Sequence, residues 1–435
     1  MSMKTVVDQV DATPSKRLFL SIIADYDLNR SICELIDNAL DLWVTNKKSQ
    51  PVSVRVELNN DQQTIFVTDN VSGVKKENLK FIVGPGQTGN LPEEETIGIF
   101  GVGTKRAVVA LSQDITITTR FLNGKTYQVE FDDNWLKDDD WSLPVYEVDE
   151  ISPGTTVISL QKLRLQLNDE LEERLRDHLS DIYAKFLIDS KVQIFLNSKL
   201  IKPLTFENWS YPPNYEPRRY RGKLDSLDGG IVNVNILAGL SNESSPAIGE
   251  YGVYLYCNNR LICRGLKTHE IGFTKGLAGP PHPNVSLTRV IISLEGPAGL
   301  MPWNSSKSGI NIHNKIFLAL QNFIITTVKD YASLSRRFEG DWPDKVFQYK
   351  KGDIVLVENV NFPQAKKSYL PPLPRTKVRY DELCQSLNKK ISGKKPWTTG
   401  LYESIIATEL IFKSNLSQKN RISLILLDST LEIAF

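Results

Sequence analysis

The sequence predicts an α+β fold, in which a two-layer sandwich of helices and antiparallel strands precedes a smaller α/β domain. Residues 32–43 place apolar side chains at helical spacing. Residues 52–58 and 64–68 alternate as strands and are joined by a polar turn, which is typical of a hairpin. A second set of strands and a long helix follow residue 188. With 435 residues, the chain is long enough for two or three such domains.

The composition is that of an ordinary globular protein. Hydrophobic residues make up 41% and charged residues 24% of the chain, and the net charge is +1. No apolar run reaches the roughly 20 residues of a membrane span, and residues 1–16 lack the apolar core of a signal peptide. The four cysteines and four histidines show no metal-ligand spacing. We therefore expect a reducing, cytoplasmic setting and no structural metal.

Charge is distributed unevenly along the chain. Residues 130–150 contain nine acidic residues and one lysine. Residues 336–400 contain fourteen Lys and Arg against seven Asp and Glu, a local excess of +7. An excess of this size can attract DNA or another polyanion. It fits a solvated connector equally well.

The first domain is expected to span residues 1–188. A loop rich in Gly and Pro occupies residues 84–92 and is followed by a predicted helix at 104–111. The remaining predicted elements are strands at 115–120, 126–131 and 155–160 and a long helix at 168–186. Helices and an antiparallel sheet in this order favour a two-layer arrangement.

The second domain is expected to span residues 189–335. Its predicted strands are 192–197, 230–237, 252–257 and 289–294, and its closing helix is 315–333. Residues 336–375 then form a basic, proline-containing linker. The last segment, residues 376–435, has two apolar helical stretches. No helix stop signal precedes Phe435, so we expect this segment to be truncated there.

The helix at residues 32–43 has a polar face. Glu34, Asn38 and Asp41 lie at positions i, i+4 and i+7, so they share one side of the helix. A carboxylate there could activate a water molecule, and an amide oxygen could bind a hard cation. A solvated polar stripe has the same spacing, and this helix alone favours that simpler interpretation.

Two further positions could contact a flat aromatic base. Asp69 ends the second hairpin strand, where a buried carboxylate can accept a hydrogen bond from an exocyclic amine. Gly73 follows it and would let the backbone approach a ring closely, although such residues also occur in ordinary turns. Thr155, at the start of a later strand, could bond a base directly or through water. A threonine at a strand start is more often structural.

A glycine-rich segment, Gly98-Ile-Phe-Gly-Val-Gly-Thr-Lys105, directly precedes a predicted helix. Free backbone N–H groups and the helix dipole favour an anion at such a site. Lys105 lies in the first helical turn, where a bound phosphate would offset the cost of its charge. The apolar residues between the glycines argue against a flexible linker. The predicted phosphate-contacting residues are Gly98, Gly101, Val102, Gly103, Thr104 and Lys105.

One more lysine lies in a loop of small residues, Pro302-Trp-Asn-Ser-Ser-Lys307-Ser-Gly309. Lys307 could reach a terminal phosphate from the second domain. A surface lysine fits the same sequence.

In their order and spacing, these motifs resemble the GHKL superfamily of ATPases with the Bergerat fold. This superfamily includes gyrase-type topoisomerases, heat-shock-ninety chaperones, histidine kinases and MutL. The resemblance covers residues 16–190. It implies that Glu34 is the general base that activates water, that Asn38 is the Mg²⁺ ligand and that Asp69 binds adenine. It also implies a phosphate loop at Gly98, Gly101 and Gly103 and an adenine-pocket contact at Thr155.

The segment at residues 189–335 resembles the ribosomal-protein-S5-like transducer domain of the topoisomerase, MutL, chaperone and MORC branches. The motif Asn258-Asn-Arg-Leu-Ile262 and the Lys307 loop are most similar to MORC proteins. This similarity implies that Lys307 contacts the γ-phosphate of ATP. Val71 stands where the family usually has Gly. Because a β-branched residue does not readily take a positive φ, we expect a different backbone there.

The resemblance implies an enzyme that hydrolyses ATP with Mg²⁺ and works as a clamp or switch that forms a homodimer on binding ATP. The basic region at residues 336–400 suggests DNA as the clamped partner, in a DNA-related or antiviral defence complex with other subunits. Two alternatives remain open. One is a chaperone-like ATPase that acts on a client protein, and the other is a nucleotide-sensing subunit with little hydrolysis.

Overall fold

The computed structural model describes most of the first 338 residues and several later segments. The described residues are 16, 26–84, 86–98, 101, 103–211, 215–226, 229–241, 250–338, 347–348, 356–362, 389–390 and 399–434. The chain divides into two compact units, residues 1–367 and residues 368–435, and each is described by itself.

Helix α2, Leu28–Thr45, is the central helix of the first unit. It begins where the Asp27 side chain accepts a hydrogen bond of 2.8 Å from the backbone N–H of Arg30, a standard helix N-cap. One face of α2 is completely buried at Ile32, Ile36 and Leu40. The amphipathic helix predicted from the sequence is therefore confirmed.

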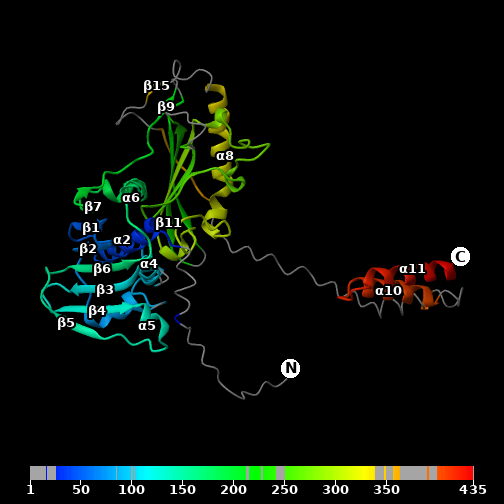
Figure 1. Cartoon of the computed structure of the whole chain (residues 1–435). Coiled ribbons are helices and arrows are strands. Elements are labelled where there is room, and N and C mark those ends of the chain that lie inside the picture. Colours follow the sequence, from blue (N-terminus) through cyan, green and yellow to red (C-terminus); the bar gives the residue numbers. More distant parts are fainter. Residues whose placement is uncertain are drawn as a thin grey trace. The chain divides into compact units, whose positions relative to one another are not determined.

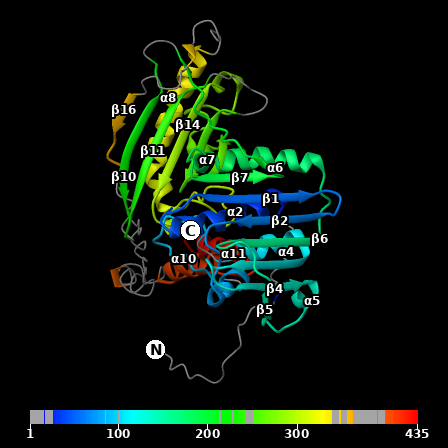
Figure 2. The same ribbon diagram turned by 90° about the vertical axis from the view of Figure 1, so that its left-hand side faces the viewer.

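The first sheet has eight strands in the order β5-β4-β3-β6-β2-β1-β7-β8. Their bounds are β1 Val52–Asn59, β2 Thr64–Asp69, β3 Ser112–Arg120, β4 Thr126–Asp132, β5 Val145–Val148, β6 Thr156–Leu163, β7 Val192–Leu196 and β8 Lys199–Leu200. Helices α4 (Gly103–Leu111) and α6 (Asp169–Ile182) flank α2 and complete the helical layer of this two-layer arrangement (Figure 2). The shorter helices are η2 Lys76–Asn78, α3 Leu79–Val83, α5 Asp133–Lys137 and α7 Ala184–Leu187.

Two details of this unit differ from the sequence-based prediction. Residues 192–197 were expected in the second domain, but β7 pairs in parallel with β1, with Val54 opposite Ile194. That assignment is wrong, because the alternating burial of a strand is the same in either sheet. The predicted helix at residues 168–186 is also interrupted at Tyr183, between α6 and α7. The domain limits themselves remain predictions.

The second sheet has six strands in the order β13-β12-β14-β11-β10-β16. Their bounds are β10 Arg218–Asp225, β11 Ile231–Leu240, β12 Gly252–Cys257, β13 Arg260–Leu266, β14 Thr288–Glu295 and β16 Leu356–Asn359. Helix α8, Lys315–Phe338, packs along β14 and β11 (Figure 1). Short elements surround them: the pair β9 (Ser210–Tyr211) and β15 (Phe347–Gln348), and η3 His269–Ile271, η4 Pro283–Val285 and η5 Ala298–Leu300.

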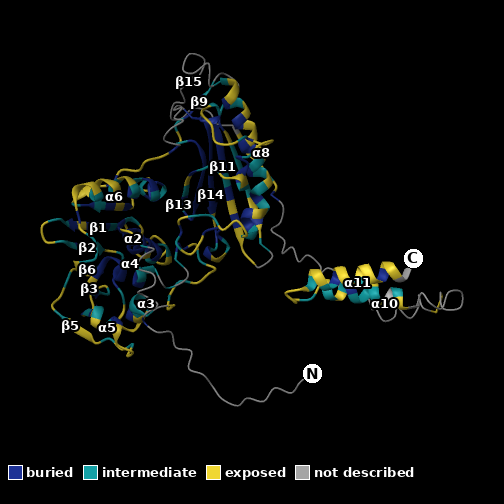
Figure 3. Ribbon diagram, turned by 45° about the vertical axis from the view of Figure 1, so that its right-hand side comes forward, coloured by how far each residue is buried: buried dark blue, intermediate teal, exposed yellow. Residues whose placement is uncertain are grey.

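Buried residues line the strands of both sheets and the helices that face them (Figure 3). The second unit contains α10, Thr399–Phe412, and α11, Lys419–Ala434, which pack against each other. They confirm the two helical stretches predicted near the end of the sequence. Among the described helices, none has the length and apolarity required to cross a membrane. Most of the basic segment at residues 336–400 lies outside the described residues.

Candidate functional site

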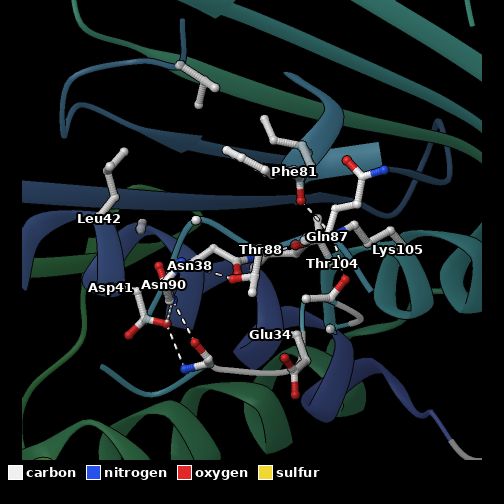
Figure 4. A pocket seen from close by; sticks show the side chains of 18 of the residues that line it. Glu34, Asn38, Asp41, Leu42, Phe81, Gln87, Thr88, Asn90, Thr104 and Lys105 are labelled. Carbon is white, nitrogen blue, oxygen red and sulfur yellow. Dashed lines mark hydrogen bonds between the residues drawn. The ribbon is translucent and has the colours of Figure 1, made fainter. Parts of the chain in front are cut away.

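A cavity of ≈ 400 Å³ opens between α2, the end of β2 and the loop that precedes α4 (Figure 4). It gathers predicted site residues that are far apart in the sequence. Those in its wall are Glu34, Asn38, Asp69, Gly98, Gly101, Gly103, Thr104, Lys105 and Lys307. Gly73 and Thr155 lie outside the wall, and Val102 lies outside the described residues.

Glu34 and Gly103 come from separate motifs and meet in this cavity. Glu34 lies in the second turn of α2 and is 4% exposed. A Cβ atom at residue 103 would lie only 2.0 Å from Glu34 Oε2. The carboxylate therefore occupies the space that the missing side chain of Gly103 leaves at the start of α4.

Asn38 is the residue best placed to meet a cation. Its Nδ2 donates a hydrogen bond of 2.5 Å to Thr104 Oγ1 (Figure 4), which leaves its amide oxygen for another partner. Within the part of the chain that the structure describes, no group of three or more His, Cys, Asp or Glu side chains could hold a metal ion. This donor set fits Mg²⁺, which is often bound by one or two protein ligands together with phosphate oxygens and water.

Asp69, the last residue of β2, also lines the cavity. Its Oδ1 accepts a hydrogen bond of 3.1 Å from the Val71 N–H, and burial raises the pKa of this carboxyl to about 6. Its partner across β2 and β6 is Thr156, which also lines the cavity. Thr156 rather than Thr155 lines the cavity, because adjacent side chains of a strand point to opposite faces.

The turn after Asp69 does not require a positive φ at Val71. The positive φ falls on Gly73, at +65°, and Val71 is not among the described residues with positive φ. A Cβ atom at residue 73 would lie 1.9 Å from the Arg120 carbonyl oxygen. Gly73 thus permits close packing of two backbone segments behind the cavity.

Lys105 has a different environment from the one expected. Its Nζ donates to the carbonyl oxygens of Phe81, Gln87 and Gly101, at 2.6, 2.9 and 2.6 Å. Burial lowers the pKa of Lys105 to about 8. The three carbonyl oxygens compensate its charge, so Lys105 joins α3 to both ends of the loop before α4.

These features agree with a comparison against known protein families. Residues 26–163 match the family described as histidine kinase-, DNA gyrase B-, and HSP90-like ATPase. Residues 26–163 are a GHKL ATPase domain. Such a domain binds ATP, typically with Mg²⁺, and implies ATP hydrolysis. A search of curated proteins finds no match for this chain.

The matched region ends before the second sheet, yet a lysine from beyond it completes the pocket of the GHKL domain. Lys307 Nζ lies 2.8 Å from Glu34 Oε2 and 3.1 Å from Asp37 Oδ2. Burial alone would lower the pKa of Lys307, but the Glu34 and Asp37 carboxylates raise it above its ordinary value. Lys307 is 5% exposed, which excludes a surface lysine.

Asp41 anchors the loop over the GHKL pocket, which we call the lid loop (described residues 86–98). Its carboxylate accepts bonds from the N–H groups of Ile97 and Gly98, at 2.6 and 2.7 Å, and from Asn90 Nδ2 at 3.0 Å (Figure 4). Burial raises the pKa of Asp41 to about 7, although the two N–H groups oppose that rise. Asp41 therefore supports the lid loop as well as α2.

The lid loop is also bonded to segments that border the second sheet: η5 after β14 and the turn between β12 and β13. The Ala298 N–H donates to the Glu94 carbonyl oxygen at 2.8 Å, and the Gly299 N–H donates to the Pro92 carbonyl oxygen at 2.9 Å. Asn258 Nδ2 adds a bond of 3.0 Å to the Thr96 carbonyl oxygen. The loop that lines the cavity is thereby connected to the strands of the second sheet through the segments beside them.

Sequence reasoning missed several residues of this GHKL site. Asp37 lies between Glu34 and Asn38 on α2 and binds the same ammonium group as Glu34, but it does not line the cavity. Asn90 lies in a loop without periodicity. Arg260 belongs to the motif at residues 258–262 that the sequence analysis identified without giving it a role. The only sequence indication that Arg260 is buried was the run of apolar residues that directly follows it in β13.

Proposed function

We propose that this chain is an ATP-driven, dimerising molecular switch in which the second sheet responds to the nucleotide. The supporting observation is Lys307, which follows β14 and reaches Glu34 in the ATP pocket at 2.8 Å. A side chain that follows one sheet thus completes the pocket built on the other. A change in the phosphates held there is therefore transmitted to the second sheet.

The pocket residues have separate roles in this proposal. Glu34 polarises a water molecule in line with the terminal phosphate. The N-terminus of α4, near Gly103 and Thr104, holds phosphate oxygens with backbone N–H groups. Asp69 accepts a hydrogen bond from the exocyclic amine of adenine. Asn38 would hold Mg²⁺ through its amide oxygen, and the ion would neutralise charge on the phosphates.

The Lys307–Glu34 ion pair provides the switch. While the pair is intact, an oxygen of the Glu34 carboxylate is occupied by the ammonium group. The terminal phosphate of ATP competes for Lys307, because a phosphate carries more charge than a carboxylate. Once Lys307 turns to the phosphate, Glu34 is free to act as a base. Hydrolysis is thereby coupled to the position of the loop that carries Lys307.

We further propose that ATP binding drives homodimerisation and that the closed dimer holds DNA. The support for DNA is the excess of +7 charges in residues 336–400. These residues would act electrostatically on the phosphate backbone, so binding would not depend on base sequence.

The substitution Glu34→Ala tests the switch. It should abolish hydrolysis, preserve ATP binding and cause the ATP-bound dimer to accumulate. Steady-state turnover, binding of a fluorescent ATP analogue and sedimentation with and without ATP measure these three properties. Glu57→Ala, an exposed position on β1, is the matched control. Wild-type turnover in Glu34→Ala would refute the role of general base.

The DNA partner is tested separately by its salt dependence. Affinity for duplex DNA should fall steeply between 50 and 200 mM salt, by about 10³-fold if six or more phosphates are contacted. The measurement is made with and without a non-hydrolysable ATP analogue. If the protein is not retained on DNA at low salt, either with or without the analogue, DNA is excluded as the partner. The proposal of an ATP-driven switch would be unaffected.

A further inference from the structure

We propose that Arg260 is a positioning residue for ATP hydrolysis, because it places Lys307 in the nucleotide pocket. It does so by binding Asp37 on α2 and the backbone of Lys307 at the same time. The inference rests on the proposed function, in which Lys307 meets the terminal phosphate. Neither Arg260 nor Asp37 lines the cavity, so both act through Lys307.

The backbone at Arg260 is held in place by the turn that precedes it. It is the first residue of β13 and follows a tight turn in which Asn258 and Asn259 have φ values of +47° and +67°. The Asn258 side chain holds this turn, since its Nδ2 donates to the Gly296 carbonyl oxygen and its Oδ1 accepts from the Gly296 N–H, both at 3.0 Å. The same Nδ2 bonds to Thr96 at the end of the lid loop. The position of the guanidinium is therefore coupled to the positions of both the second sheet and the lid loop.

The guanidinium of Arg260 makes two different contacts. Its Nε lies 3.0 and 2.9 Å from the two carboxylate oxygens of Asp37. Its Nη1 donates a hydrogen bond of 2.9 Å to the carbonyl oxygen of Lys307. The rigid fork of a guanidinium can make both contacts at once, whereas the single ammonium of a lysine is less suited to do so.

The contact with the Lys307 carbonyl supports an unfavourable backbone. Lys307 has φ +52°, a region that non-glycine residues seldom adopt and that persists where neighbouring groups hold it. Arg260 supplies one such contact, and the bond from the Lys307 N–H to the Asn304 carbonyl oxygen at 3.0 Å supplies another. With the backbone held in this way, the Lys307 side chain points at Glu34.

Charge balance explains why Arg260 is needed. Glu34 and Asp37 face Lys307 and Arg260, and these four side chains are all buried, at 4%, 1%, 5% and 4% exposure. When Lys307 turns to the phosphate, Asp37 loses one cation but keeps Arg260. A carboxylate without a cation in this buried position would be costly. Arg260 therefore lowers the cost of moving Lys307 away from Asp37.

The substitutions Arg260→Gln and Arg260→Lys test this inference. Affinities for ADP and for a non-hydrolysable ATP analogue are measured along with turnover and thermal unfolding. In Arg260→Gln, turnover and the preference for the analogue over ADP should each fall by about tenfold, typical of coupling between two sites. The affinity for ADP should remain unchanged, because ADP lacks the terminal phosphate. Arg260→Lys should be intermediate, since it keeps a cation beside Asp37.

The matched control is Arg264→Gln. Arg264 lies on the same strand, β13, but its partners are Asp181 and Glu250, neither of which lines the cavity. It should bind both nucleotides and turn over ATP like the wild type.

Several results would overturn the inference. Equal losses of ADP and analogue affinity, together with a lower melting temperature, would show that Arg260 only supports the fold. If Arg260→Gln keeps the wild-type preference for the analogue over ADP while Lys307→Ala loses turnover, Arg260 does not position Lys307. The proposed function would then still hold. Wild-type turnover in Lys307→Ala would refute the proposed role of Lys307 itself. If Arg260→Gln does not fold, Arg260→Lys decides through the same ratio of affinities.

Discussion

Replacing Gly103 with alanine should disable hydrolysis and preserve the fold. The added Cβ would lie 2.0 Å from Glu34 Oε2, and real Cβ contacts are essentially never shorter than 3.0 Å, so the carboxylate must withdraw by about 1 Å (3.0 minus 2.0). A displacement of about 1 Å at a reacting group can cost about 10²-fold in rate, which is about 2.7 kcal/mol of activation free energy. Residue 103 does not have a positive φ. Its backbone therefore accepts alanine, which has the higher helix propensity.

The assay compares steady-state turnover, affinity for a fluorescent ATP analogue and the melting temperature of Gly103→Ala with those of the wild type. The control is Gly400→Ala on α10, a position that does not line the cavity and where an added Cβ would meet nothing within 4 Å. We expect about hundredfold slower turnover only in Gly103→Ala, with both proteins stable and able to bind the analogue. Wild-type turnover in Gly103→Ala would show that the Glu34 carboxylate does not need its place at the start of α4.

Two other predictions concern the lid loop. Burial raises the pKa of Asp41 from 3.8 to about 7, so its favourable contribution to stability is complete below about pH 4 and is lost as the pH rises to about 7. The free energy of unfolding should therefore decline less between these pH values in Asp41→Asn than in the wild type. Urea titrations at several pH values measure it. Equal slopes of the free energy of unfolding against pH in the two proteins would contradict this prediction. Lys105→Met removes the donor shared by three carbonyl oxygens. It should lower the free energy of unfolding by about 1–3 kcal/mol and raise the KM for ATP, whereas an unchanged midpoint in urea and an unchanged KM would exclude this role.

The sequence predicted those parts of the site that depend on local pattern. Glu34 and Asn38 are one helical turn apart, and the glycines before α4 directly precede a helix, so their placement follows from spacing. The helices α2, α4 and α8 were likewise visible as periodic apolar residues. These features depend on neighbours in the chain.

The features that were missed depend on pairing between distant segments. Arg260 and Asp37 are separated by 223 positions, and no local pattern relates them. The exchange of Thr155 for Thr156 follows from the register of β6 against β2, because a shift of one residue moves every side chain of a strand to the other face. Strand β10 was not predicted because its sequence, Arg-Arg-Tyr-Arg-Gly-Lys-Leu-Asp, lacks apolar alternation.

The bonds between the lid loop and the second sheet have a consequence for mutagenesis. Ala298 and Gly299 donate through their backbone N–H groups to backbone oxygens of Glu94 and Pro92. Alanine at Glu94 or Pro92 leaves all of the bonded atoms in the chain, so these two substitutions would not reveal the connection. Alanine at Gly299 would place a Cβ 3.1 Å from Pro92 Cβ and is therefore the substitution that tests it. Proline at position 298 would remove the N–H group that donates to the Glu94 carbonyl oxygen, so it would break one of these bonds. Sequence variation at Glu94 and Pro92 is thus compatible with an unchanged backbone connection between the lid loop and the segment that follows β14.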